Sequence, residues 1–191
     1  MKGAGTDLAI RDSFAENVEV VIWTPGSSKG LPLSINPLQL DGISDLSTED
    51  QIRYFSSTAK NIANFIGYDL SRDDGKSAES ILAIIFEHCT KQSITLNDFS
   101  DLVAILRAMP DSVNEVVETI ASDRFLHQLV KKLNLLTLGA RKLIFQTGIP
   151  ASIEVLLGLD DFSNKTRVSV IYLNTLHTTE EKSFFPAARF R

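Results

Sequence analysis

Two short apolar runs decide the fold: Val18-Glu-Val-Val-Ile-Trp23 near the start of the 191-residue chain and Val168-Ser-Val-Ile-Tyr-Leu173 near its end. Both are rich in β-branched residues, and continuous runs of this kind are typical of strands buried on both faces of a parallel sheet. We therefore predict strands over Val18–Thr24 and Arg167–Leu173. Such strands need neighbours on either side, so the pattern indicates the middle of a larger sheet.

The sequence between these runs has the periodicity of helices, about seven in number. Ser47-Thr-Glu-Asp50 has the spacing of a capping box and predicts a helix that runs to Gly67. Thr95-Leu-Asn-Asp98 repeats that spacing ahead of another helix. Apolar residues cover so much of the circumference of 78–88 that we expect this helix to be the most buried one.

The connection between the two strands is far longer than a parallel pair requires. A complete βαβ unit needs only about 30 residues, whereas this connection runs from Pro25 to Thr166. An inserted helical subdomain explains the excess. We predict three parts: residues 1–46 (helix, strand and a Pro/Gly loop), 47–150 (helical insertion) and 151–191 (strand and helix).

Composition excludes several classes of protein. The net charge is −5 and the pI is near 5.2, which argues against a free-standing electrostatic DNA-binding protein. The single cysteine, Cys89, excludes an internal disulfide and fits a reducing compartment. No apolar run has the roughly 20 residues of a membrane helix, and the first residues lack the apolar segment of a signal peptide. We therefore expect a cytoplasmic location without membrane contact.

The sequence contains no complete catalytic motif. Gly75-Lys-Ser77 matches the end of a phosphate-binding P-loop, but the pattern also requires a glycine where Leu70 stands. A helix N-terminus capped by Ser77 is the favoured interpretation. Gly26-Ser-Ser-Lys-Gly30 follows a strand and could form a small anion nest, although a structural turn is favoured. An enzyme built around the loop from Pro25 to Pro37 stays an alternative without a general base.

Histidine and cysteine also give no clear site. His88 and Cys89 are adjacent, so their side chains lie about 100° apart on a helix and cannot together hold one metal ion. We expect a buried cysteine beside a histidine at the boundary of the core. Metal ligands and catalytic residues are therefore not assigned.

Four segments together resemble the HerA-like ATPases of bacteria, which are relatives of the FtsK-type DNA pumps. The resemblance extends from about Val18 to Phe185 and depends on the order and spacing of the segments. It implies a helix-dominated α/β fold, in which two main strands form part of a P-loop ATPase sheet that carries a large multi-helical insertion. The segments are Val18-Glu-Val-Val-Ile-Trp-Thr-Pro-Gly-Ser27, Pro32-Leu-Ser-Ile-Asn-Pro37, Leu133-Asn-Leu-Leu-Thr-Leu-Gly-Ala-Arg-Lys142 and Lys165-Thr-Arg-Val-Ser-Val-Ile-Tyr-Leu-Asn174.

In that family these segments lie between the Walker A loop and the Walker B acids. Walker A would precede Met1, and Walker B would follow the helix that begins at 178–181, so the resemblance implies a catalytically incomplete segment. ATP and Mg²⁺ are expected only for a full-length family member and not for this chain. The implied partners are the remainder of a split or truncated ATPase and, in the full-length context, DNA or a nuclease.

Five basic residues are candidate contacts for nucleic acid or a partner. Four of them follow one another in and after a predicted helix that otherwise has few acids, and a solvated helix face is the alternative explanation. A stand-alone helical protein-interaction module without enzymatic activity is the alternative function, and the oligomeric state stays open. The candidate residues are Lys29, Lys131, Lys132, Arg141 and Lys142.

Overall fold

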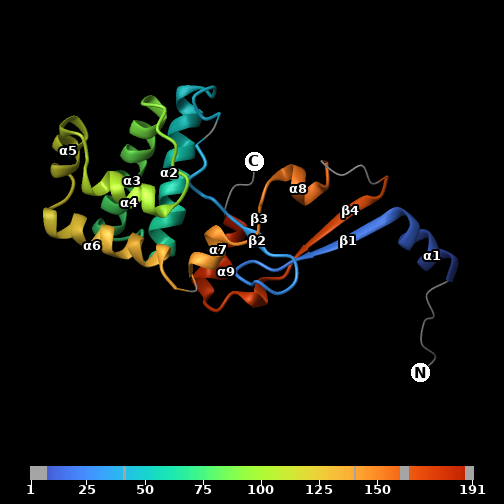
Figure 1. Ribbon diagram of the computed structural model, residues 1–191. Helices are drawn as coiled ribbons and strands as arrows, with labels where there is room; N and C mark the ends of the chain where they lie inside the picture. The colour runs from blue at the N-terminus through green and yellow to red at the C-terminus, as the bar shows by residue number, and fades with distance from the viewer. Residues whose placement is uncertain (1–7, 41, 140, 160–163, 188–191) are drawn as a thin grey trace.

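Figure 1 shows the computed structural model, which describes residues 8–40, 42–139, 141–159 and 164–187. The molecule is elongated, with a lobe of helices at one end and a two-stranded arm at the other. The arm consists of β1 (Val18–Trp23) and β4 (Thr166–Ile171), and α1 (Leu8–Asn17) extends from its far end. The fold is α/β and dominated by helices, as the sequence predicts.

The helical lobe is built around α2 (Thr48–Phe65) and α3 (Asp73–Lys91), which pack against each other. The predicted cap of α2 is confirmed, because the Ser47 hydroxyl accepts a hydrogen bond from the backbone N–H of Asp50. Beyond the helix, Gly67 adopts a left-handed conformation with φ +82°, which glycine tolerates best. Six residues of α3 have no exposed surface, more than in any other described helix, so the prediction that this helix is the most buried one is confirmed.

The start of α3 differs from the prediction. The helix begins four residues before Ser77, and Arg72 occupies the N-cap position without a side-chain hydrogen bond, so the predicted Ser77 cap is wrong. Gly75 lies in the first turn, where an added Cβ would be 2.1 Å from the carbonyl oxygen of Asp69. The glycine is therefore required for close packing of the preceding turn. The sequence Gly75-Lys-Ser77 is helical here and does not form a phosphate-binding loop.

Three shorter helices complete the lobe: α4 (Phe99–Arg107), α5 (Asp111–Glu118) and α6 (Asp123–Asn134). The sequence predicts a capping box that starts at Thr95, but the cap of α4 is Asp98. One Asp98 carboxylate oxygen accepts hydrogen bonds from two backbone N–H groups of the first turn. A carboxylate directly before the helix is a strong N-cap acceptor, which explains why the helix begins three residues later than that box would place it.

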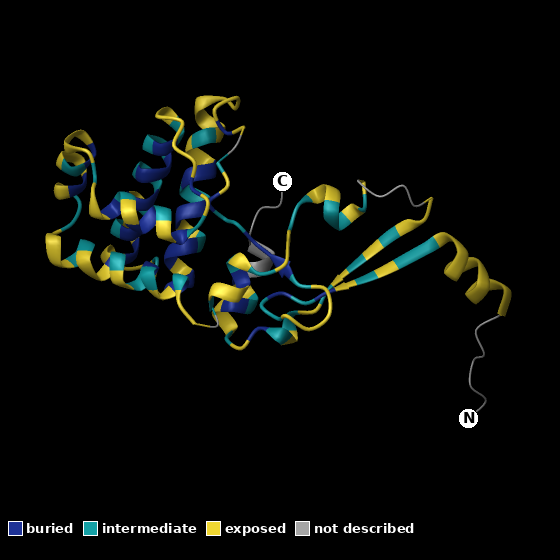
Figure 2. Cartoon of the chain, in the orientation of Figure 1, coloured by how far each residue is buried: buried dark blue, intermediate teal, exposed yellow. Residues whose placement is uncertain are grey.

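The lobe contains a hydrophobic core of its own. Figure 2 shows that the buried residues concentrate on the inward faces of its helices, whereas the arm is mostly half-buried or exposed. Phe86 is the largest of the fully buried side chains. A closed core of this size makes the lobe the most stable part of the molecule. Its members with no exposed surface are Leu38, Ile43, Ala59, Ile62, Ala63, Ala78, Ile81, Leu82, Ile85, Phe86, Cys89, Leu102, Val117, Leu129 and Leu133.

A small joint connects the lobe to the arm. After η1 (Leu135–Thr137), α7 (Arg141–Gln146) leads into β3 (Ile149–Pro150), which pairs in parallel with β2 (Leu33–Ser34). A second, smaller core lies here and combines residues from the predicted first, second and third parts of the chain. It consists of Trp23, Leu33, Ile35, Ile144 and Leu176.

The final helix returns to the lobe. After η2 (Leu173–Thr175), α9 (Thr179–Ala187) places the Phe184 ring 4.5 Å from the ring of Phe65, measured between centroids. Phe145 of α7 contacts both rings, at 5.6 and 5.9 Å. These aromatic contacts hold α7 and α9 against α2. They attach the joint and the last helix to the core of the lobe.

Candidate functional site

The two strands of the arm pair with each other in parallel. The register is unbroken from Val18 opposite Thr166 to Trp23 opposite Ile171, close to the predicted strand positions. In the described part of the chain no further strand pairs with β4, and the outer edge of β1 has one bridge, between Trp23 and Leu31. The arm is thus a two-stranded parallel sheet with largely open edges.

One face of this sheet is covered by α8 (Ile153–Leu157), which contacts β4. Polar side chains of the two strands form hydrogen bonds on this face. Arg167 donates two hydrogen bonds to one carboxylate oxygen of Glu19, directly opposite it in the register, at 2.7 and 2.9 Å. The Trp23 indole donates to the Ser169 hydroxyl at 2.9 Å, and that hydroxyl donates to a backbone carbonyl of α8. These side chains fix the register and hold α8 on this face.

The other face of the sheet is bare and apolar. Val20 and Ile22 of β1 are 49% and 53% exposed, and Val168 and Val170, which lie opposite them on β4, are both 42% exposed. Figure 2 shows exposed positions alternating along both strands. The prediction that both faces of these strands are buried is therefore wrong for this chain, because the described residues contain no layer that covers the second face.

The helix at the far end of the arm is also uncovered. In α1, Leu8 and Ile10 are both 64% exposed and Phe14 is 52% exposed, and the helix has no buried residue. Its contact with the arm includes a hydrogen bond of 2.8 Å from the Lys165 ammonium to the carbonyl oxygen of Ala15. The exposed large apolar side chains of α1 and the bare face of the sheet are thus both without a partner among the described residues.

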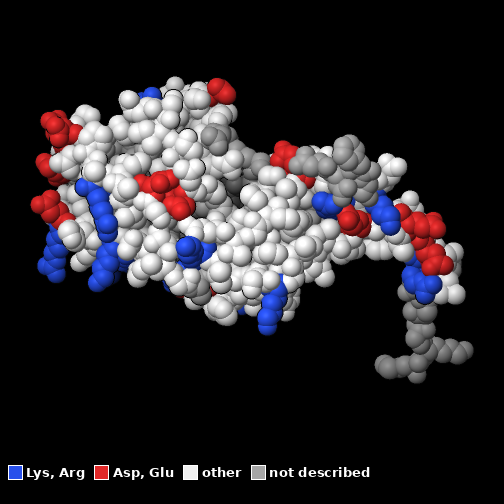
Figure 3. Space-filling view, in the orientation of Figure 1, with Lys and Arg blue, Asp and Glu red and all other residues white. Residues whose placement is uncertain are grey.

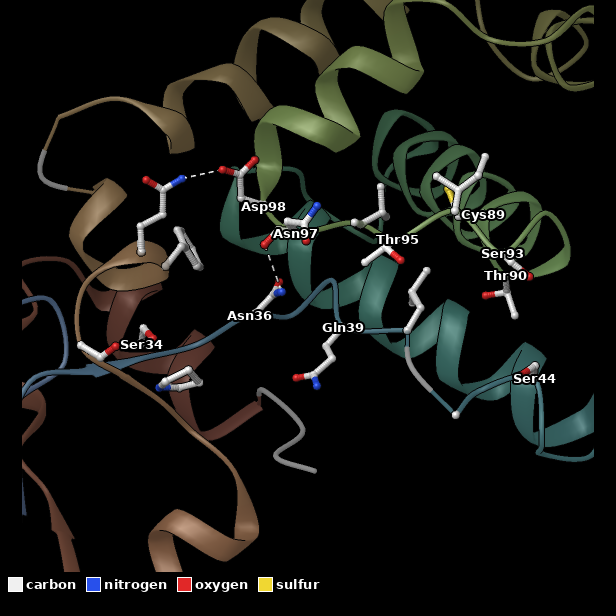
Figure 4. A pocket seen from close by; sticks show the side chains of 18 residues that line it. Ser34, Asn36, Gln39, Ser44, Cys89, Thr90, Ser93, Thr95, Asn97 and Asp98 are labelled. Carbon is white, nitrogen blue, oxygen red and sulfur yellow. Dashed lines mark hydrogen bonds between the residues drawn. The ribbon is translucent and has the colours of Figure 1, made fainter.

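A cleft of about 800 Å³ separates the joint from the lobe (Figure 4). It lies between the chain after β2 and the turn that connects α3 to α4. Asn36 bridges these two segments, since its side-chain N–H donates to the Asn97 carbonyl at 3.1 Å. Gln146 donates to the Asp98 carboxylate at 2.7 Å from the α7 side. The sequence gives no signal for these contacts, because they join positions that are far apart in the chain.

The side chains around the cleft do not form a catalytic set. Cys89 reaches its wall but has no exposed surface, and burial raises the pKa of its thiol to about 11. The thiol is thus protonated at neutral pH and is not a nucleophile. Asp98 is committed to its helix cap and to Gln146. The predicted burial of Cys89 and the half-buried position of His88 are both confirmed.

The structure separates the five basic candidates. Lys131 and Lys142 are exposed, and Lys29 is exposed in the loop after β1. Lys132 instead donates hydrogen bonds to the Ile66 and Gly67 carbonyls at 3.0 and 3.4 Å, so it caps the C-terminal end of α2. Its ammonium also lies 4.3 Å from the centre of the Tyr68 ring. Lys132 is therefore a structural residue of the lobe.

Arg141 also has a structural contact. Its guanidinium lies 3.8 Å from the carboxylate of Glu181, which is buried and accepts backbone hydrogen bonds at the start of α9. Figure 3 shows basic side chains dispersed among acidic and neutral ones on this face, not gathered in one stripe. Lys132 and Arg141 thus have structural contacts, whereas Lys131 and Lys142 are exposed and stay candidate contacts.

The loop from Pro25 to Pro37 is held by hydrogen bonds within its first turns and to neighbouring segments. The Thr24 hydroxyl donates to the Lys29 carbonyl at 2.7 Å, and the Ser27 hydroxyl accepts from the Lys29 backbone N–H at 3.1 Å. Gly26 and Gly30 have positive φ and occupy tight turns. Asn36 is committed to the bridge across the cleft. The geometry fits the predicted structural turn.

Two further kinds of site are absent from the described residues. No cluster of three or more His, Cys, Asp or Glu side chains there is placed to hold a metal ion. None of the helices described is both long and apolar enough to cross a membrane. The unpartnered sheet of the arm is therefore the feature that most needs a functional explanation.

Comparison with known proteins gives no relative. No family model, no curated protein and no solved structure matches the chain. A functional conclusion for this chain must therefore depend on the resemblance of its segments and on its own geometry.

Proposed function

We propose that this chain is a catalytically incomplete segment of a HerA-like DNA helicase or translocase ATPase. Its arm supplies two strands to the parallel ATPase sheet, and its lobe is the helical insertion of that domain. The bare apolar face of the sheet, formed by Val20, Ile22, Val168 and Val170, carries this proposal. ATP and Mg²⁺ belong to elements outside the chain, and the location is the cytoplasm.

Physical chemistry favours a larger sheet over an isolated pair. Parallel sheets occur almost only with both faces covered, because their crossovers place helices on each side. Two strands alone are at best marginally stable in water. The arm has the parallel register and the apolar composition of such a sheet, but α8 covers one face only. Further strands at the open edges and a second layer of helices would complete it.

The residues on the covered face support the same assignment. The Glu19–Arg167 pair and the Trp23–Ser169 hydrogen bond fix one register between β1 and β4. A slip of the register by one residue would turn every side chain to the other face of the sheet. Because the register of this pair is fixed, its faces are defined, and further strands can pair with its edges. The remainder of a split or truncated ATPase is therefore the proposed partner. DNA or a nuclease is a partner of the assembled enzyme only.

The closed core of the lobe favours a second candidate function, a stand-alone helical protein-interaction module without enzymatic activity. Its core forms without any residue of the arm, because every member of that cluster lies between Leu38 and Phe184 and outside β1 and β4. In that case the arm is an appendage and its bare face has no occupant. The experiment below separates the two candidates.

We expect the purified chain to show no Mg²⁺-dependent ATP hydrolysis above a heat-inactivated control, because none of the residues that the structure describes forms a phosphate cradle. Affinity-tagged chain produced in its own host should co-purify a Walker A protein that hydrolyses ATP. Replacing both Val20 and Val168 by lysine should abolish this association, because the two residues are neighbours in the register and would place two charges side by side on the bare face. ATP hydrolysis by the chain alone would contradict the proposal.

The matched control is Leu135→Lys, since Leu135 is 51% exposed on η1 and lies far from the arm. It should leave the association unchanged. All variants should keep the helical circular dichroism of the parent, because each replaces an exposed side chain. If the Val20 and Val168 variant still bound the same ATPase, or if the co-purified partner had no Walker A sequence, the interaction-module candidate would replace the proposal.

A further inference from the structure

A second hollow, of about 720 Å³, lies on the surface of the lobe between α6 and the end of α4. Its apolar wall is formed by Leu106 and Met109 from the end of α4 and by Leu126 and Val130 of α6. Leu106 is buried and the other three are half-buried, so apolar surface faces the groove. We call this surface the α4–α6 groove.

Basic side chains flank the apolar wall. His127 and Lys131 follow Leu126 and Val130 by one residue, so α6 presents an apolar row and beside it a polar, basic row. Arg107 stands on the opposite side, directly after Leu106. The sequence pattern favours Lys131 as a contact, but it gives no indication of Arg107, which belongs to another helix.

These cations have no acidic partner within the described residues. None of the ion pairs found there includes Arg107 or Lys131, although the structure pairs other lysines and arginines of the lobe, such as Arg53 and Lys91. The one acid that lines the groove is Asp123, at the first turn of α6. The groove lining thus carries two cations, Arg107 and Lys131, against one acid, and that acid lies at one terminus of α6.

We propose that the α4–α6 groove binds a short amphipathic helix of a partner protein, with acidic residues along one edge. Its apolar row would pack on Leu126 and Val130, and its carboxylates would meet Arg107 and Lys131. Apolar helices commonly lie in such grooves and use residues at i, i+3, i+4 and i+7 as anchors. The groove follows α6, which at about 1.5 Å per residue accommodates a helix of roughly 12 residues.

Charge complementarity selects this occupant over two others. A second copy would bring two cations of each groove, Arg107 and Lys131, against a single acid, Asp123, so a two-fold contact is less favourable than an acidic helix. Duplex DNA requires several cations around a wide surface, whereas this groove has an apolar wall and the chain carries a net charge of −5. This inference is independent of the ATPase proposal, since it uses no residue of the arm.

The test uses a fluorescently labelled synthetic helix of roughly 12 residues, rich in alanine, with leucine at i, i+3, i+4 and i+7 and glutamate along one edge. Binding to the full chain is measured by fluorescence anisotropy. We expect saturable binding that the double variant R107E and K131E weakens at least about tenfold. The matched control R124E, an exposed cation of α6 outside the groove, should change the affinity by less than about twofold.

Two further probes make the result decisive. A peptide with lysine in place of every glutamate should bind at least about tenfold more weakly than the acidic peptide. A duplex oligonucleotide should not compete. The proposal is overturned if the acidic peptide does not bind, if the two peptides bind equally, if R124E acts like the double variant, or if the oligonucleotide displaces the peptide.

Discussion

Replacing Phe86 by alanine should lower the free energy of unfolding of the lobe by about 3–5 kcal/mol. Phe86 has no exposed surface and is the largest fully buried side chain of the main core. Its removal deletes apolar contacts and leaves a cavity that neighbours on rigid helices cannot fill. Equilibrium unfolding in urea, followed by circular dichroism, measures the change through a lower midpoint.

The control for this prediction is Phe14→Ala, because Phe14 is the same residue type but is 52% exposed on α1. Its stability should change by less than about 0.5 kcal/mol. A comparable loss in both variants would show that the arm and α1 belong to the same cooperative core as the lobe. That outcome would contradict the division between a stable lobe and an unsupported arm.

Replacing Gly75 by alanine should destabilise the lobe by about 3 kcal/mol, although helix propensity alone predicts a gain. Inside a helix, alanine is normally more stable than glycine by roughly 0.5–1 kcal/mol. Here the new Cβ would lie 2.1 Å from the Asp69 carbonyl oxygen and 2.8 Å from the Cα of Leu70. Because both neighbours are backbone atoms, α3 would have to move away from the turn before it. The sign of the measured change therefore distinguishes packing from propensity.

Gly67→Ala is the matched comparison. Its φ of +82° makes any side chain unfavourable, but the nearest atom to an added Cβ is the flexible Lys132 ammonium, at 3.8 Å. We expect a loss of about 1 kcal/mol. A stabilising effect of Gly75→Ala in urea unfolding, or a larger loss for Gly67→Ala, would contradict the packing described for the start of α3.

The local structure of this chain follows closely from its sequence. The β-branched runs at Val18 and Val168 form the two strands of the arm, and the capping box at Ser47 starts α2. Helical periodicity places the core of the lobe, including Cys89. These features depend on neighbours within a few residues, and pattern arguments describe such neighbours well. The errors at Ser77 and Thr95 concern which of several polar residues caps a helix.

Long-range contacts could not be read in the same way. The Asn36 bridge to Asn97 and the side-chain contact between Gln146 and Asp98 join segments whose spacing carries no repeating pattern. The role of Lys132 as a cap on α2 likewise requires the position of α6 beside that helix. Runs of basic residues therefore overstate the available positive surface, because only the folded chain shows which cations are already used.

The burial of the strands is a third feature that could be predicted from the sequence only in part. Their composition predicts cover on both faces, and the chain supplies it on one. The apolar residues were correctly assigned to strands, but the layer that would bury Val20 and Val168 is not among the described residues. A mismatch of this kind between composition and burial is the observation on which the proposed partner surface depends.

Hydrogen exchange of the backbone amides of β1 and β4, in the free chain and in its complex with the co-purified ATPase, tests the central claim most directly. In the free chain these amides should exchange with protection factors below about 100, while those of α2 and α3 should exceed about 10⁴. In the complex, β1 and β4 should approach the protection of the lobe. Equal protection of the strands and the lobe in the free chain would contradict the claim that the arm is part of a larger sheet.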